Sequence, residues 1–166
     1  MYNYKHYSSS MDNLIIFCAK YLIAGPAALV TYIWLKGNRR ATIRLSAAFI
    51  IAGVVALLLV KLFGELFYNP RPFITEGIVP LVSHGNDNGF PSEHTTLAMT
   101  LTSLLFFYGA RKLALLSLAM TLAIGIGRVL ADVHSPIDIA GGLVVGTIAG
   151  YFGWWLAKRV NFSSKT

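Results

Sequence analysis

The stretch GRVLADVHSPID, residues 127–138, places an arginine, two aspartates and a histidine between two long apolar runs. LALLSLAMTLAIGI, residues 113–126, precedes it, and IAGGLVVGTIAGYFGWW, residues 139–155, follows it. A helix that crosses a bilayer needs about 20 mostly apolar residues, and both runs approach that length. The stretch therefore indicates a short polar connection between two transmembrane helices.

The composition of the whole chain also indicates a membrane protein. Hydrophobic residues make up 55% of the 166 positions and charged residues 13%, which is too apolar for an ordinary soluble domain. We expect an all-α, polytopic helix bundle that forms a single membrane domain over residues 1–166, with about five transmembrane helices. Their expected ranges are 14–35, 41–67, 94–108, 113–127 and 136–157.

The basic residues predict the orientation of the bundle. Most of them gather in three segments that fall on the same side of a five-span chain, namely Lys36, Arg39, Arg40 and Arg44, then Arg111 and Lys112, then Lys158, Arg159 and Lys165. The positive-inside rule makes that side cytoplasmic. The net charge of +7 is thus explained without a soluble basic face, so we expect no nucleic-acid partner.

The acidic residues and histidines map to the opposite side, in outer loops or at the outward ends of spans. They are Asp12, Glu65, Glu76, Asp87, Glu93, Asp132 and Asp138, with His6, His84, His94 and His134. We therefore expect the chemistry at the extracytoplasmic surface. The long connection 68–92 is expected to be an ordered outer loop, because its aromatic and aliphatic residues argue against disorder.

Three short segments at span ends carry most of these polar groups: PRPF (70–73), FPSEHT (90–95) and GRVLADVHSPID. Ser92 and Ser135 have the pattern of N-cap residues, the second followed by Pro136 at the first helical position. Two helix N-termini on one face favour an anion. Arg71 and Arg128 lie beside them. An arginine side chain can bind two oxygens of one phosphate group at once.

A histidine and a carboxylate complete a site for phosphoryl transfer. His134 is a candidate nucleophile with Asp138 four residues on as its orienting carboxylate, and His94 is a candidate general acid. This set needs no metal and no cofactor. A lipid-linked phosphate would keep its tail in the bilayer and present its head group to these residues.

Structural explanations compete with each of these assignments. Ser135 to Asp138 is also a capping box without catalysis, His94 fits a solvated surface residue, and Arg71 and Arg128 fit anchors for lipid head groups. A metal site built from the histidines and acids lacks the ligand spacing typical of zinc.

Other polar and small residues have simple structural explanations. Lys61 and Glu65 are most simply an intramembrane ion pair, although ionisable residues in spans are functional candidates by default. We interpret three further residues as polar loop residues without a direct chemical role, namely His84, Asp87 and Asp132. Cys18 is interpreted as a packing residue. Small residues at four-residue spacing predict close helix packing in the last span, at Gly142, Gly146 and Gly150.

The three segments together resemble the signature of the type 2 phosphatidic acid phosphatase superfamily. The matches are Arg71-Pro72, then Pro91-Ser92-Glu93-His94, then Arg128, His134 and Asp138 with five and three residues between them. The family lysine would fall at Gly64, Glu93 replaces a glycine, and Gly127 replaces a serine. The pattern GELFYNPRPF followed by FPSEHT looks like the undecaprenyl-diphosphate phosphatase branch of the bacitracin-resistance type, in which that lysine is often absent.

This resemblance implies a role for each matched residue. His134 would form a phosphohistidine, Asp138 would orient it, and His94 would protonate the leaving phosphate. The residues implied to bind the phosphoryl group are Arg71, Arg128 and Ser92, with the adjoining Pro72 and Glu93.

The expected function is hydrolysis of undecaprenyl diphosphate, a polyprenyl diphosphate, at the outer face of a bacterial inner membrane. The alternative substrates are phosphatidylglycerophosphate, phosphatidic acid or a lipid A phosphate. From another class, a small transporter or channel with an anion site at its mouth would need polar residues through its spans, yet Lys61 and Glu65 stand out there alone. The sequence leaves the oligomeric state open.

Overall fold

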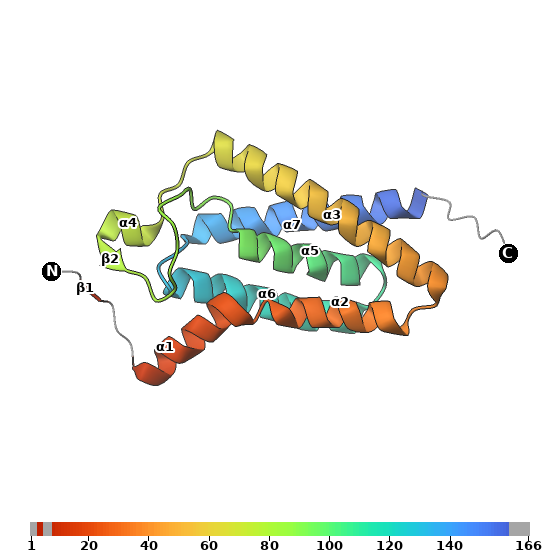
Figure 1. The fold of residues 1–166 in the computed structure, drawn as a ribbon, viewed down its shortest axis with the longest axis horizontal. Helices are drawn as coiled ribbons and strands as arrows, with labels where there is room; N and C mark the ends of the chain where they lie inside the picture. The colour runs from red at the N-terminus through yellow and green to blue at the C-terminus, as the bar shows by residue number, and fades with distance from the viewer. Residues whose placement is uncertain (1–2, 5–7, 160–166) are drawn as a thin grey trace.

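A computed structural model describes residues 3–4 and 8–159 of the chain (Figure 1). Its helices are α1 (Ser9–Ile16), the π-helical segment η1 (Phe17–Tyr21), α2 (Ala24–Lys36), α3 (Arg39–Leu66), α4 (Pro72–Glu76), α5 (Glu93–Phe107), α6 (Arg111–Leu130) and α7 (Pro136–Arg159). Two short strands, β1 (Asn3–Tyr4) and β2 (Ile78–Val79), pair in parallel. His6 and Lys165, which the sequence assigned to opposite sides, lie outside the described residues.

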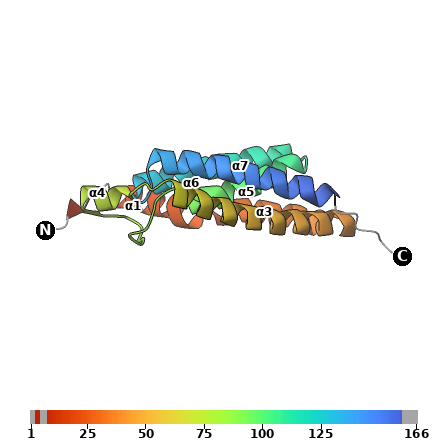
Figure 2. The same ribbon diagram turned by 90° about the horizontal axis from the view of Figure 1, so that it is seen from above.

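Helix α5 forms the centre of the bundle. It packs against α6 and α7 and also contacts α2 and α3, while α7 packs against α3 (Figures 1 and 2). Its buried hydroxyls pair with those of α6, because Thr102 Oγ1 lies 2.6 Å from Ser117 Oγ and 3.0 Å from Thr121 Oγ1. Hydroxyl pairs of this kind join helices where apolar contacts alone give little net attraction in lipid.

The predicted small-residue face of α7 packs against α5. A Cβ atom added at Gly146 would lie 2.5 Å from the carbonyl oxygen of Thr96, and one at Gly142 would lie 2.8 Å from that of Ser92. The two backbones can therefore approach this closely only because these positions lack side chains. The contact fixes the start of α5 beside the start of α7.

The first expected span, 14–35, is a broken helix. The segments Ser9–Tyr21 and Ala24–Lys36 meet at a bend of 43°. Pro26 explains the break, because it has no N–H with which to continue the helical ladder. Within the described residues α3, α6 and α7 are long and apolar enough to cross a membrane, and the bent pair would make a fourth span.

The expected span 94–108 corresponds to α5, which is shorter than a membrane-crossing helix. Its 15 residues extend over about 22 Å, against a hydrocarbon core of about 30 Å. Within the described residues, four helices contact it, with α6 and α7 making the main contacts and α2 and α3 the others, so protein neighbours surround much of its length.

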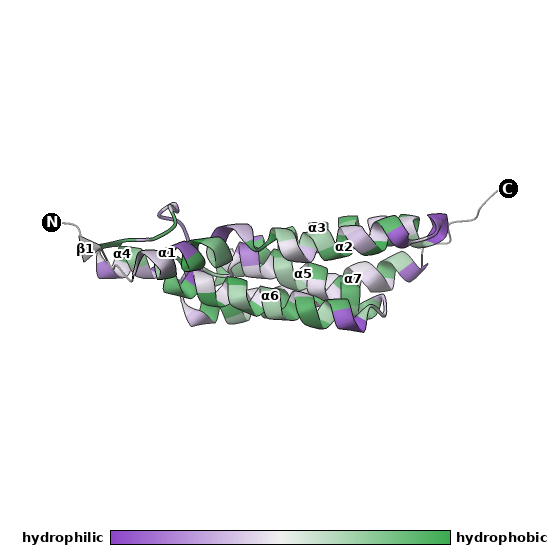
Figure 3. Ribbon diagram, turned by 90° about the horizontal axis from the view of Figure 1, so that it is seen from below, coloured by the Kyte–Doolittle hydropathy of each residue, from purple (hydrophilic) through white to green (hydrophobic). Residues whose placement is uncertain are grey.

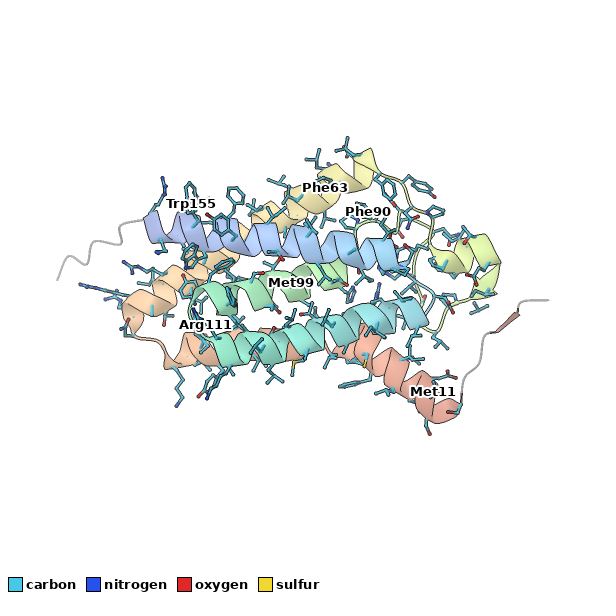
Figure 4. All side chains as sticks on the ribbon, turned by 180° about the vertical axis from the view of Figure 1, so that it is seen from behind. Met11, Phe63, Phe90, Met99, Arg111 and Trp155 are labelled. Carbon is cyan, nitrogen blue, oxygen red and sulfur yellow. The ribbon has the colours of Figure 1, made fainter. Side chains whose placement is uncertain are left out.

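The two ends of the bundle differ in chemistry. The ends of α3 and α6 and the starts of α5 and α7 meet at one end, together with the loop that carries Phe90 (Figures 1 and 4). The opposite end carries Arg111 and Trp155 (Figure 4), and hydrophilic residues gather near it at the starts of α3 and α6 (Figure 3). The separation of basic and acidic segments agrees with the predicted arrangement.

Candidate active site

The three predicted segments meet around one cavity at the loop end of the bundle. The cavity has a volume of about 490 Å³ and lies between the end of α3, the loop, the start of α5 and the end of α6. Its polar lining residues are Lys61, Glu65, Arg71, His84, Asp87, Asn88, Glu93, His94, Arg128 and His134.

Two buried arginines converge on one nitrogen of His134. Nη1 of Arg71 and Nη2 of Arg128 each lie 3.3 Å from its Nε2 atom. A guanidinium group can only donate hydrogen bonds, so this arrangement assigns Nε2 as the acceptor and Nδ1 as the protonated nitrogen. The lone pair of Nε2 therefore points toward the two positive charges.

The carboxylate of Asp138 holds the other side of the His134 ring. Its Oδ2 atom lies 3.4 Å from Nδ1 of His134 and accepts a hydrogen bond from the backbone N–H of Ser135 at 2.8 Å. The second of these bonds is one half of the predicted capping box at the start of α7. The carboxylate thus serves both the helix start and the histidine.

Asn69 completes the environment of Asp138 and was missed by the sequence analysis. Its side-chain N–H donates to Oδ1 of Asp138 at 2.7 Å and to Oγ of Ser135 at 2.7 Å. Asn88, also missed, donates to the carbonyls of Gly64 at 2.6 Å and Phe67 at 2.9 Å. Asn88 thereby ties the loop to the end of α3.

Arg71 is buried and cross-links the site, so the alternative of a head-group anchor is wrong for it. Its Nη1 donates to the carbonyl of Val133 at 2.9 Å, and its Nη2 donates to that of Asn88 at 3.2 Å. Its Nε donates to Oδ1 of Asp87 at 2.9 Å. The hydrogen bonds from Nη2 and Nε thus orient the guanidinium group so that Nη1 faces His134.

Arg128 is 1% exposed, which also excludes a head-group anchor. Its Nη1 donates to the carbonyl of Ala19 in η1 at 3.4 Å, whereas its Nε is buried with no partner in the described structure. An unsatisfied buried donor on a cation is suited to an anionic ligand. The preceding Gly127 is required by packing, since a Cβ there would lie 2.8 Å from that of Cys18.

His84 and Asp87 are more than polar residues of a loop, because both lie next to other residues of the site. The ring of His84 meets that of His134 edge to face, with 5.9 Å between centroids, and its Nδ1 lies 3.9 Å from Oδ1 of Asp87. Asp132, by contrast, is buried in a left-handed turn with φ of 59°, where its carbonyl accepts from the N–H of Phe73 at 3.0 Å. Asp132 therefore shapes the turn between α6 and His134.

Burial and positive neighbours lower the pKa of both His134 and His84. Burial lowers the pKa of His134, and Arg128 and Arg71 lower it further, although its hydrogen bond to Asp138 acts in the opposite direction. Burial and the charges of Arg71 and Arg128 lower the pKa of His84 to about 4. Despite the opposing effect of burial, the hydrogen bond from Arg71 lowers the pKa of the Asp87 carboxyl.

The segment around Ser92 is only partly brought to the cavity. His94 lines the cavity and is half-buried, and Glu93 lies exposed on its rim. Ser92 precedes α5 as predicted, but its hydroxyl makes no capping bond and accepts instead from Oγ1 of Thr95 at 3.2 Å. It is fully buried and, like Pro72, which starts α4, is not among the cavity-lining residues.

Two further predictions concern charges in and around the cavity. The expected ion pair between Lys61 and Glu65 is wrong, because neither residue has a salt-bridge partner within the described part of the chain, although both line the cavity. Across residues 3–4 and 8–159, no group of three or more His, Cys, Asp or Glu side chains is arranged to hold a metal ion.

Comparison with known proteins gives relatives over most of the chain. Bacitracin transport permease protein BcrC of Bacillus licheniformis is 33% identical over 93% of this chain and 75% of its own length. Undecaprenyl-diphosphatase BcrC of Bacillus subtilis strain 168 is 32% identical over 88% of this chain and 75% of its own length.

A solved structure shares the fold. The crystal structure of the first transmembrane PAP2 type phosphatidylglycerolphosphate phosphatase from Bacillus subtilis has a TM-score of 0.68 at 18% sequence identity, over 95% of this chain and 82% of that one. The sequence model of the PAP2 superfamily matches residues 41–162, which is most of the chain and includes every segment of the cavity. The chain is therefore a member of the PAP2 superfamily of phosphatases.

Proposed function

We propose that this multi-pass membrane phosphatase hydrolyses undecaprenyl diphosphate to undecaprenyl phosphate and inorganic phosphate, and so recycles the lipid carrier of cell-wall assembly. One observation carries the proposal: two buried arginines converge on Nε2 of a neutral histidine whose Nδ1 faces a buried carboxylate. This arrangement combines a nucleophile with charges that would stabilise a phosphoryl group. The identity of the lipid is supported by the relative named undecaprenyl-diphosphatase.

In the proposed reaction, Nε2 of His134 attacks the terminal phosphorus and forms a phosphohistidine. The bond from phosphorus to the bridging oxygen breaks, and its electron pair stays on the lipid phosphate. Asp138 stabilises the imidazolium that develops, because its Oδ2 faces the Nδ1–H group. Water then attacks the phosphohistidine, which releases inorganic phosphate and restores His134.

The surrounding groups would hold the transferring phosphoryl group. Arg71 and Arg128 lie within reach of oxygens on a phosphorus bound to Nε2, and the unpaired Nε of Arg128 is available to one of them. The first turn of α5 adds backbone N–H groups that have no partner within the helix, including those of Glu93 and His94. The Glu93 carboxylate itself would repel phosphate, so Glu93 would bind the phosphoryl group through its backbone N–H alone.

His94 is proposed to supply the protons. It lines the same cavity as His134 and follows directly after the first residue of α5. As general acid it would protonate the leaving lipid phosphate, and as general base it would then activate the water. Ser92 is proposed to position this helix start, since its N–H donates to the carbonyl of Asp138 at 3.0 Å.

The experiment is phosphate release by purified protein from undecaprenyl diphosphate, phosphatidylglycerophosphate and phosphatidic acid, each with and without excess chelator. We expect the highest kcat/KM for undecaprenyl diphosphate and no loss in chelator, because the side chains and backbone of the protein supply every proposed role. A preference for a glycerolipid would overturn the assigned substrate. Loss of activity in chelator, with recovery on adding one metal, would overturn the mechanism.

A further inference from the structure

Lys61 is a cation in the cavity wall that the proposed reaction does not use. It lies on α3, is exposed, and lines the same cavity as Arg71, Arg128 and His134. Glu65 and Glu93 line the cavity too, yet Lys61 forms no ion pair with either of them in the described structure. Its ammonium group therefore remains available to a ligand.

The loop packs closely against Gly64, three residues after Lys61 on α3. A Cβ atom at Gly64 would lie 3.2 Å from the carbonyl oxygen of Phe90, and the side chain of Asn88 donates to the Gly64 carbonyl at 2.6 Å. The loop thus packs closely against Gly64, and a side chain there would have to displace it, although Gly64 also borders the cavity. Lys61 lies three residues earlier on the same helical face and opens to the cavity.

An apolar groove continues from Lys61 toward the middle of the bundle. A second cavity of about 330 Å³ lies between α3 and α5 and shares Leu57, Val60 and Glu93 with the first. Gly53 helps to form it, since no atom lies within 4 Å of a Cβ added there. Gly53 lies about 12 Å below Lys61 along the helix.

The order of these features matches the order of groups in a lipid diphosphate. His134 would take the terminal phosphorus, and the groove between α3 and α5 suits an apolar tail that continues into the bilayer. The inner phosphate joins these two parts, so it would lie between His134 and the groove. Lys61 directly follows Val60, which lines both cavities, and so places a positive charge near their junction.

We propose that Lys61 binds the inner phosphate of a lipid diphosphate and thereby selects diphosphates over monophosphates. The proposal rests on the function proposed above. As the bond between terminal phosphorus and bridging oxygen breaks, negative charge grows on the inner phosphate, which stays on the lipid. The ammonium group of Lys61 stabilises that charge, whereas a monophosphate with the same tail has no group at this position.

The test compares Lys61→Gln with the unaltered protein on geranylgeranyl diphosphate and geranylgeranyl monophosphate, which share one tail. We expect kcat/KM for the diphosphate to fall about 10- to 100-fold, the loss that follows removal of one charge-assisted hydrogen bond. Turnover of the monophosphate stays within about twofold. Lys61→Arg keeps most of the selectivity for the diphosphate. Lys112→Gln, at the other end of the bundle, leaves the turnover of both substrates unchanged.

The outcomes separate the two proposals. Failure of the unaltered protein to hydrolyse either geranylgeranyl diphosphate or undecaprenyl diphosphate overturns the proposed function itself. The role of Lys61 alone is overturned by a different result. In that result the unaltered protein turns over the diphosphate normally, and Lys61→Gln loses activity equally on both substrates or loses none. A second measurement compares inhibition by inorganic pyrophosphate with inhibition by inorganic phosphate. Lys61→Gln should weaken inhibition by pyrophosphate and leave inhibition by phosphate unchanged. Equal changes in both would also contradict the proposed role of Lys61.

Discussion

Asp138 serves the start of α7 and the His134 ring with the same carboxylate. Its Oδ2 atom faces Nδ1 of His134 at 3.4 Å and accepts from the N–H of Ser135 at 2.8 Å. Side-chain capping and the proposed catalytic role of Asp138 are therefore compatible. The helix start fixes the carboxylate, and the fixed carboxylate sets the tautomer and orientation of the histidine.

Asn69 is the residue whose removal should separate positioning from substrate binding. It donates to Oδ1 of Asp138 at 2.7 Å but does not line the cavity. We expect Asn69→Ala to lower kcat about 10- to 100-fold, because a charged acceptor loses a partly buried hydrogen bond. KM for undecaprenyl diphosphate should hardly change, and both constants come from initial rates of phosphate release.

Asn13→Ala is the matched control, since Asn13 is exposed on α1, and we expect it to retain the unaltered kcat. A raised KM with an unaltered kcat in Asn69→Ala would contradict the positioning role and place Asn69 in contact with the substrate.

The site residues that the sequence predicted are those near one another in the chain or matched by the family signature. Arg128, His134 and Asp138 stand close together at the junction of two helices, so their spacing alone brings them to one place. Asn69 lies 69 residues before Asp138, and its contact depends on how the loop folds over the helix ends. No local pattern reports such a contact.

At the level of elements, the long loop behaves as a structural part of the bundle. Asn88 bonds the carbonyls of Gly64 and Phe67 and accepts from the N–H of Asn69 at 2.9 Å. These bonds fasten the loop to the end of α3 and hold Arg71 over His134. The register of the loop against α3 depends on these tertiary contacts, which a local sequence pattern does not report.

The break in the first span and the enclosure of α5 likewise became visible only in the structure. Hydropathy reports apolar runs, and both segments qualify by that measure. It does not report that Pro26 interrupts a helix at a bend of 43°, or that a helix of 15 residues is enclosed by its neighbours. Apolar content alone therefore predicts about five helices, but not that one of them is broken and another is enclosed by its neighbours.

The contact between α5 and α7 supports a prediction about stability. In Gly146→Ala the added methyl group would lie 2.5 Å from the Thr96 carbonyl oxygen and 2.7 Å from Cβ of Met99. Overpacking costs about 1–3 kcal/mol, whereas alanine gains about 1 kcal/mol over glycine in a helix. We therefore expect a lower Tm in detergent, measured by the loss of folded protein on heating.

Gly53→Ala is the corresponding control on α3, where no atom lies within 4 Å of the added Cβ. Its Tm should stay unchanged or rise, because helix propensity then acts without a clash. Equal changes in Tm for the two variants would show that the glycines of α7 do not set the packing distance.

At the level of the whole molecule, charge divides the bundle into two ends. The described basic residues at the end away from the cavity are Lys36, Arg39, Arg40, Arg44, Arg111, Lys112, Lys158 and Arg159. We propose that this end faces the cytoplasm, as the positive-inside rule predicts. The catalytic cavity then opens on the extracytoplasmic side of a bacterial inner membrane, where the outer half of the bilayer supplies the lipid.

Cysteine labelling in intact cells tests this orientation. Cys18 is the single cysteine of the chain, so Cys18→Ala gives a background without thiols. Onto it are placed Ser83→Cys, in the loop beside the cavity, and Lys112→Cys, at the basic end, both at exposed positions. A membrane-impermeant maleimide should label the first in intact cells and the second only after permeabilisation, because the bilayer separates the two ends. Reversed labelling would place the cavity in the cytoplasm, and labelling of both in sealed cells would contradict a single orientation.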